Sequence, residues 1–305
     1  MPGSGLDVVT GAFGYTGKYI ARRLLAMGRR VRTLTGHPNR PNPFGGGVEV
    51  ASLAFEDPAQ IAEGLRGAAT LYNTYWIRFA QGELTFDRAV ENTKRLLWAA
   101  EEAGVRRIVH VSIANASVES PLPYFRGKGL IEEAIKGLGM SYAILRPTVI
   151  FGPEDILINN IAWCLRRFPV FAVPGSGAYR IQPIFVEDMA DLAVRLGRGD
   201  DNAVVDAVGP EIFAFRDLVR VIRDSIGSQA CILRVPPRLT YGLARVTGLL
   251  VRDVVLTWDE ILGLMESLLV SLTPPTGTTR LGAWLAANAD TVGVRYASEV
   301  LRHYR

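Results

Sequence analysis

Short apolar runs and amphipathic segments alternate along the first half of the chain. The runs are typical of strands, and the segments, with apolar residues three or four positions apart, are typical of helices packed by one face. Strands joined by such helices have right-handed crossovers and form a parallel, doubly wound sheet, with ligands at the C-terminal strand ends. The predicted strands lie near 6–10, 30–35, 48–52, 69–73, 107–112 and 142–147, and the predicted helices near 16–27, 58–66, 84–103 and 123–138.

The pattern changes after Arg146. Loops become longer and prolines interrupt the apolar runs, so the regular alternation ends there. A run near 203–208 still predicts a strand, which we expect to return to the main sheet. The interpretation is a nucleotide-binding domain, residues 1–150, and a substrate lobe with a helical tail, residues 151–305. The predicted fold class is α/β, a doubly wound parallel sheet with a smaller interleaved C-terminal lobe.

The composition is that of a soluble globular enzyme. Of the 305 residues, 49% are apolar and 21% are charged, which excludes a disordered chain. No apolar run is long enough for a membrane span, and the nearest candidate, 239–257, carries three charges and is expected to form an amphipathic helix. The net charge of +4 is mildly basic, and no motif for reading nucleic acid is present, so no nucleic-acid partner is expected.

Cysteine and histidine usage predicts a reducing compartment and no metal. Cys164 and Cys231 lie far apart, without a C-x-x-C spacing, and are expected to be buried free thiols. The three histidines are scattered, which disfavours a metal site. The first predicted strand begins almost at the N-terminus, so no signal peptide is expected and the predicted location is cytoplasmic.

Three glycines spaced three apart follow the first predicted strand. Gly11 allows a sharp turn, Gly14 lets the backbone approach a pyrophosphate, and Gly17 lets the next helix pack close to the strand. The free N–H groups at the start of that helix then hold the anion. This pattern predicts a dinucleotide site, with a plain strand–turn–helix connection as the alternative. The other residues of the turn expected to contact the cofactor are Phe13, Tyr15 and Thr16.

Tyr124 and Lys128 are four residues apart in a predicted helix and therefore share one face. A phenol, with a pKa of about 10, is too basic for proton transfer at neutral pH, and a nearby ammonium lowers that pKa. Ser112 ends the preceding apolar strand, where its hydroxyl is expected to bond a substrate oxygen. These three residues form a predicted acid–base unit for redox chemistry at a carbonyl or alcohol carbon.

Gly127 and Gly129 weaken the same predicted helix, each by about 1 kcal/mol relative to alanine. We interpret them as points of close backbone approach, with the cofactor as the first candidate. Tight helix–helix packing is the alternative.

Four motifs together resemble the extended and atypical short-chain dehydrogenases/reductases, a superfamily with the Rossmann fold. They are the G-x-x-G-x-x-G turn, the Y-x-x-x-K-x-x-x-E pattern ending at Glu132, the stretch Ile144–Pro153 and the segment Gln182–Ala190. The resemblance spreads over about residues 6–220. The chain departs from the family pattern at Gly127, where extended members carry serine.

Within that superfamily the pair Gln182-Pro183 resembles the atypical branch that includes the nucleotide-binding accessory subunit of respiratory complex I. Sugar-nucleotide epimerases and dehydratases usually carry Arg-Asp at this place, so that activity is disfavoured. The helical tail from Trp258 onward is similar to the same branch. Some members bind NADPH tightly and catalyse nothing, so the resemblance implies a nucleotide site with either a catalytic or a non-catalytic role, and a protein partner or a homo-oligomer.

The end of the second predicted strand discriminates between cofactors in this superfamily. Residues 31–37 contain no acid that would repel a 2′-phosphate, so NADP(H) is favoured over NAD(H), although many atypical members carry arginine in place of Gly36. The residues expected at the 2′-phosphate are Thr35, His37 and Arg40; those at the adenine are Ser52 and Leu53; those at the phosphates and ribose are Asn73, Thr74 and Lys128; and that at the nicotinamide end is Pro147.

Four residues are expected to face the substrate. Tyr75 and Trp76 follow the fourth predicted strand and would form a pocket wall, with packing against the tail as the alternative. Asn159 and Arg180 belong to the predicted substrate lobe. The leading hypothesis is an NADP(H)-preferring reductase or dehydrogenase acting on a small molecule. The alternatives are a non-catalytic nucleotide-binding protein and, third, a sugar-nucleotide epimerase or dehydratase.

Overall fold

The computed structural model describes residues 5–303, so the outermost residues of both predicted domains, 1–4 and 304–305, lie outside it. The chain divides into two compact units. The first unit contains the residues up to Pro147 together with Met189–Asp206, and the second contains Thr148–Asp188 together with the residues from Ala207 onward. The chain therefore crosses from one unit to the other three times.

A seven-stranded sheet forms the centre of the first unit, in the order β11-β6-β5-β4-β1-β2-β3. Every pairing from β3 to β6 is parallel. The order reverses between β1 and β4, and ligands of doubly wound sheets bind at this kind of switch point. The strands are β1 (Leu6–Thr10), β2 (Arg30–Thr35), β3 (Val48–Ser52), β4 (Ala68–Asn73), β5 (Arg107–Val111), β6 (Ser141–Pro147) and β11 (Ala203–Ala207).

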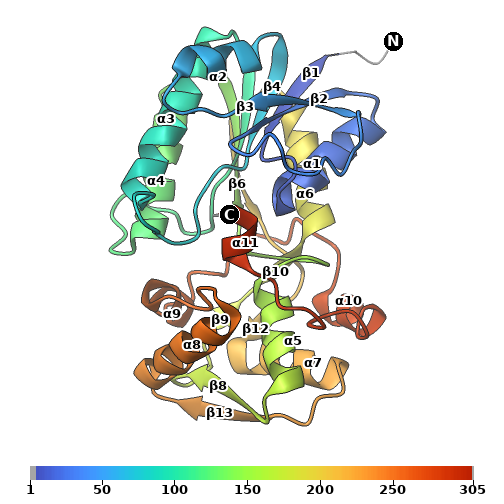
Figure 1. Cartoon of the computed structure of the whole chain (residues 1–305), viewed down its shortest axis with the longest axis vertical. Coiled ribbons are helices and arrows are strands. Elements are labelled where there is room, and N and C mark those ends of the chain that lie inside the picture. Colours follow the sequence, from blue (N-terminus) through green and yellow to red (C-terminus); the bar gives the residue numbers. More distant parts are fainter. Residues whose placement is uncertain (1–4, 304–305) are drawn as a thin grey trace. The chain divides into compact units, whose positions relative to one another are not determined.

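Helices cover both faces of this sheet (Figure 1). One face carries α1 and α6, which are joined by an ion pair of 2.8 Å between Arg23 and Asp191, and the other carries α2, α3 and α4. Because both faces are covered, all five residues of β1 are buried. The helices are α1 (Tyr15–Ala26), α2 (Pro58–Leu65), α3 (Phe86–Glu102), α4 (Pro123–Lys136) and α6 (Val186–Gly197).

Local sequence signals explain where the helices of this unit begin. Asp57 caps α2 by accepting a hydrogen bond from the Gln60 N–H, and Thr85 caps α3 in the same way. Pro123 occupies the first turn of α4, where its missing N–H costs nothing. The core beneath α2, α3 and α4 is built from apolar side chains at helical spacing, including Ile61, Leu65, Leu96, Leu97, Ile131 and Ile135.

The second unit is built from three two-stranded sheets and six helices among the described residues. Its core includes Phe151, Leu218 and Trp284. The sheets pair β10 with β7, β12 with β9, and β13 with β8. The strands are β7 (Val149–Phe151), β8 (Val170–Pro174), β9 (Arg180–Ile181), β10 (Pro183–Phe185), β12 (Phe213–Ala214) and β13 (Cys231–Val235). The helices are α5 (Leu157–Arg167), α7 (Phe215–Ser225), α8 (Pro237–Val251), α9 (Trp258–Met265), α10 (Leu281–Ala287) and α11 (Glu299–His303).

The predicted α/β fold class is confirmed, including the strand near 203–208, which is β11 beside β6. Two details differ. The helix expected over 239–257 ends at Val251, because Arg252 has a left-handed backbone with φ of 54°. Cys164 and Cys231 are free thiols as expected, but neither is fully buried: Cys164 is half-buried, and Cys231 is exposed because most of β13 faces solvent. No described helix has the length and apolar character needed to cross a membrane.

Candidate functional site

The turn after β1 lies at the switch point of the sheet and requires glycine at Gly11 and Gly17. Gly11 has a φ of +64°, which side chains disfavour. A Cβ on Gly17 would lie 2.4 Å from the Gly11 carbonyl oxygen, and one on Gly14 would lie 3.2 Å from the same oxygen. Gly17 therefore lets α1 start directly against the end of β1, as expected from the sequence.

The first turn of α1 has no side-chain cap. Its N-cap residue, Gly14, has no side chain to cap the helix, and the first turn carries no acidic residue. Unsatisfied N–H groups and the positive end of the helix dipole together favour an anion. The turn and the helix start thus fit a pyrophosphate, with Phe13, Tyr15 and Thr16 half-buried around it.

The ends of β1 and β4 are joined by hydrogen bonds around Thr10. Its Oγ1 accepts from the N–H of Thr74 at 2.7 Å and of Tyr75 at 3.1 Å, and donates to Asn73 Oδ1 at 3.1 Å. The Thr74 hydroxyl donates to the Thr10 carbonyl at 2.6 Å. Asn73 is fully buried. It therefore supports the loop beneath the predicted cofactor position rather than offering a free amide to it.

Residues predicted to contact the adenosine also lie close together in the structure, at the ends of β2 and β3. Thr35 and Ser52 are register partners at the ends of β2 and β3, and the Leu53 N–H donates to the Thr35 carbonyl at 2.9 Å. The Thr35 hydroxyl oxygen accepts from the His37 N–H at 3.0 Å. His37 is exposed and Arg40 half-buried on the following loop. The cationic loop thus begins at the strand end where the sequence predicts a 2′-phosphate.

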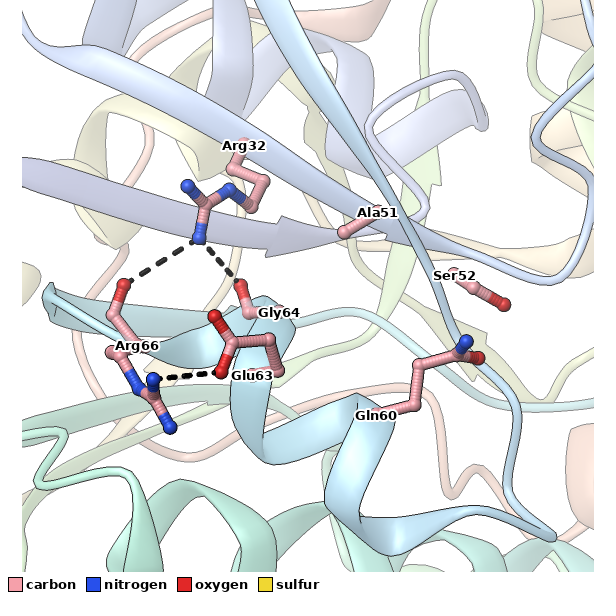
Figure 2. A pocket seen from close by; sticks show the side chains of 7 residues that line it. All are labelled: Arg32, Ala51, Ser52, Gln60, Glu63, Gly64 and Arg66. Atoms are coloured by element: carbon pink, nitrogen blue, oxygen red, sulfur yellow. Dashed lines mark hydrogen bonds and ion pairs between the residues drawn. The ribbon is translucent and has the colours of Figure 1, made fainter.

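A cavity of about 400 Å³ lies beside this end, on the α2 side of β2 and β3 (Figure 2). Arg32 donates to the Gly64 carbonyl at 2.9 Å and to Glu49 at 2.8 Å, and Arg66 pairs with Glu63 at 2.9 Å. Both guanidinium groups of the lining are thus paired with acids, and Glu49 is shared between Arg32 and Arg30. The lining residues of the cavity are Arg32, Ala51, Ser52, Gln60, Glu63, Gly64 and Arg66.

Tyr124 and Lys128 lie one turn apart on α4, as expected. Lys128 is 2% exposed, and its Nζ donates to the Val111 carbonyl at the end of β5, at 2.7 Å. Burial lowers the pKa of Lys128 to about 7, and the negative charge of Glu132 opposes that shift. A buried amine that titrates near neutrality is a feature of functional sites.

The indole of Trp76 covers this pair. Its ring centre lies 4.7 Å from Lys128 Nζ and 5.8 Å from the Tyr124 ring, which it meets edge-on. A Cβ on Gly127 would lie 2.7 Å from Trp76 Cη2, and one on Gly129 would lie 2.5 Å from the Ser117 backbone. The interpretation of these two glycines as a close approach to cofactor is therefore wrong: protein atoms occupy both positions.

The Ser112 hydroxyl is engaged by a neighbouring carboxylate. Its hydroxyl donates to Glu132 Oε1 at 2.5 Å, and Glu132 also forms an ion pair with Arg146. Both Ser112 and Glu132 are buried. The hydroxyl proton of Ser112 is thus used within the fold, which argues against a role of Ser112 as a donor to the substrate. Pro147, at the end of the same strand as Arg146, accepts a backbone hydrogen bond from Ala114 at 2.8 Å.

Two neighbours of the site escape sequence reasoning. His110 Nδ1 lies 3.1 Å from Asn73 Nδ2, and burial, then the charge of Lys128, lowers the pKa of His110 well below its usual value. Asn92 on α3 donates to the Tyr75 hydroxyl at 3.1 Å, which turns that hydroxyl toward the helix rather than toward a substrate. Each is a polar residue on an otherwise apolar strand or helix face, and this is the feature of the sequence that could have identified them.

The two predicted substrate residues of the second unit, Asn159 and Arg180, differ in their exposure to solvent. The Asn159 amide donates to Asp155 Oδ2 at 2.9 Å, and its oxygen accepts from the Gly293 N–H at 3.2 Å. Asn159 is buried, so both its polar atoms are used within the fold, and a substrate role for it is corrected. Arg180 is exposed on β9.

Gln182 of the Gln-Pro pair is likewise structural. Its amide donates to the Gly209 carbonyl at 2.9 Å, and its oxygen accepts from the Ser271 N–H at 3.1 Å. The side chain thus joins two loops of the second unit. Within the part of the chain that the structure describes, no group of His, Cys, Asp or Glu is arranged to hold a metal ion.

Residues 11–155 match a family model described as NAD(P)H-binding. The chain is 25% identical over 282 residues to subunit 9 of the NADH dehydrogenase (ubiquinone) 1 alpha subcomplex of Arabidopsis thaliana, covering 86% of this chain and 70% of the relative. It is 28% identical over 265 residues to sterol demethylase protein B of Methylococcus capsulatus, covering 78% of this chain and 79% of the relative.

Among solved structures, the triphenylmethane reductase of Citrobacter sp., complexed with NADP(H), matches with a TM-score of 0.74 and 17% identity. The match covers 93% of this chain and 99% of the reductase, and at this identity it shows the fold alone. Taken with the family model and the relatives, it confirms the resemblance drawn from the motifs. The chain therefore resembles the extended, epimerase-like short-chain dehydrogenases/reductases, and residues 11–155 are the part that matches an NAD(P)H-binding family.

Proposed function

We propose that this protein is an NADP(H)-preferring reductase or dehydrogenase that acts on a carbonyl or alcohol carbon of a small molecule. The observation that carries the proposal is the buried Lys128, one helical turn from Tyr124 and directly beside the end of β5. A nicotinamide cofactor, when bound, supplies or accepts the hydride. The remaining chemistry falls to residues of this chain.

Tyr124 donates or removes the proton at the reacting oxygen. Its phenol needs a nearby positive charge to act near neutral pH, and the Lys128 ammonium is the cation one turn away. Burial weakens that charge in the free protein, because it lowers the pKa of Lys128 to about 7. A phosphate-bearing ligand near Lys128 would favour the charged form.

Trp76 forms one wall of the proposed site around Lys128. Its ring shields Lys128 from water, and its Nε1 is buried without a hydrogen-bond partner among the described residues.

The proposed preference for NADP(H) rests on the loop after β2. Residues 31–40 contain no acid, and the loop carries His37 and Arg40 beyond Thr35, the register partner of Ser52.

The second candidate is a non-catalytic nucleotide-binding protein. Two observations favour it: the match to a complex I subunit, and the engagement of Ser112 by Glu132 rather than by an open pocket. Under this reading bound nucleotide stabilises the fold by mass action, and a protein partner replaces the small substrate. A sugar-nucleotide epimerase is the third candidate, and Gln182 in place of the family's arginine counts against it.

Titration of the purified chain with NADPH and NADH, followed by a screen of small carbonyl compounds, tests the proposal. We expect tighter binding of NADPH and turnover of at least one carbonyl compound. The Tyr124→Phe variant should bind NADPH as the wild type does and should lose turnover. Unchanged turnover in Tyr124→Phe would refute its role, and binding without any turnover would favour the second candidate.

A further inference from the structure

Helix α8 of the second unit presents apolar side chains to solvent. It packs on β8 and α9 (Figure 1), yet only Thr240 and Gly248 among its residues are buried. A contiguous exposed apolar face on a soluble domain marks an interaction surface, whereas single exposed side chains do not. The exposed aliphatic residues, with their exposed fractions, are Leu239 (51%), Leu243 (47%), Val246 (58%), Leu249 (80%) and Leu250 (72%).

These side chains form one stripe. Leu239, Leu243, Val246 and Leu250 are spaced by four, three and four residues, which places them on one face of a helix with 3.6 residues per turn. Arg238 and Arg245 are spaced by seven, so they follow one edge of that stripe, and Arg252 follows directly after the end of the helix; all three are exposed. The exposed side of α8 is therefore an apolar stripe with a cationic border.

The charge of this region has one sign. From Cys231 to Arg252 the chain contains four arginines and no aspartate or glutamate. The next acid, Asp253, is buried and accepts hydrogen bonds from the backbone of Glu299 at 2.8 Å and of Val300 at 3.2 Å. It caps α11 and does not neutralise the arginine border.

We propose that α8 docks on the surface of a bilayer that contains anionic phospholipid. The apolar stripe would enter the boundary between headgroups and acyl chains, and the arginines would bind lipid phosphates. Helices that lie in this plane combine one apolar face with Lys or Arg beside it. The attraction is the ordinary one between a cationic segment and a negative surface potential.

A second copy of the chain fits this face less well. In a two-fold contact the same surface meets itself, so antiparallel α8 helices packed by their apolar stripes would carry both arginine borders on the same side. Neither segment offers an acid to that side, and like charges brought together in an interface are costly. A lipid surface satisfies the leucines and the arginines at once.

Co-sedimentation of the full-length chain with vesicles tests the proposal. Vesicles of phosphatidylcholine alone are compared with vesicles that also contain phosphatidylglycerol, at low and at high salt. We expect binding only to the anionic vesicles and weaker binding at high salt. The double variant Leu249→Gln/Leu250→Gln should bind at least about tenfold more weakly, and each Arg→Gln change in the border about fivefold more weakly.

The matched control is Leu272→Gln, because Leu272 is 99% exposed and lies outside α8. It should bind anionic vesicles as the wild type does. All variants alter exposed side chains, so circular dichroism and melting should show them folded. No binding of the wild type to anionic vesicles, or equal binding by the double variant and the control, would overturn the proposal. Self-association that the double variant abolishes, without vesicle binding, would assign the face to a second copy and overturn it too.

Discussion

Replacing Lys128 by methionine should stabilise the fold while removing the ammonium that the proposed chemistry needs. Methionine is of similar length and apolar, so it fills the same space without the cost of burying a charge. Burial lowers the pKa of Lys128 from 10.5 to about 7, whereas in the unfolded chain the amine keeps its ordinary value. The folded state therefore holds this proton less tightly than the unfolded state does.

The magnitude follows from the two pKa values. At pH 7 the difference in proton affinity disfavours the folded state by about 4 kcal/mol. Methionine removes this cost, but it also removes the hydrogen bond to the Val111 carbonyl and the contact with the Trp76 ring, together about 2–3 kcal/mol. The expected net gain in the free energy of unfolding is about 1–2 kcal/mol at pH 7, the difference between these two figures.

Urea denaturation at pH 7 and pH 9 provides the assay. The unfolded state binds more protons than the folded state between these values, so wild-type stability should rise with pH, by about 2 kcal/mol over this interval. Lys128→Met should lack this rise, and it should show no turnover of any substrate that the wild type accepts. Parallel pH profiles for the two proteins would refute the reasoning, because they would mean that Lys128 is not buried as a weakly basic amine.

Two further predictions concern single sites. Gly17→Ala should abolish NADPH binding and lower the melting temperature, since its Cβ would lie 2.4 Å from the Gly11 carbonyl oxygen. The control is Gly242→Ala, at a helical position where an added Cβ would have no atom within 4 Å, and it should raise the free energy of unfolding by up to about 1 kcal/mol. Equal melting temperatures for the two variants would contradict the clash at Gly17. Asp155→Asn should change the pH dependence of stability, because burial raises the pKa of Asp155 to about 7. Its stabilising contribution is complete below the unfolded pKa and is lost as the pH rises through about 7. Denaturation midpoints at pH 4 and pH 7 should therefore differ more in wild type than in Asp155→Asn, and an equal difference in the two proteins would contradict this.

Much of the candidate site was accessible from local patterns. The positions of Gly11, Gly14 and Gly17 after an apolar run predict the turn, because a turn before a helix is specified within a few residues. Tyr124 and Lys128 share a face because they are four apart on a helix. The confirmed strand near 203–208 was also visible, since its apolar character is independent of where it pairs.

Other site features depend on residues distant in sequence. Trp76 follows β4, yet it covers Lys128 on α4, and this contact explains Gly127 better than a cofactor does. The engagement of Ser112 by Glu132 likewise joins a strand end to a helix. Neither pairing has a fixed spacing, so no local pattern could indicate it.

The sequence alone determined the order and type of the elements, the glycine turn and the shared face of Tyr124 and Lys128, because each depends on interactions between near neighbours in the chain. The tertiary structure decided which polar groups remain open to a ligand. Asn73, Ser112 and Asn159 lie at positions typical of ligand contacts, but the fold uses their polar atoms. It also decided that the apolar stripe of α8 faces solvent. A periodic pattern shows that a helix has an apolar face, and only packing decides what covers it.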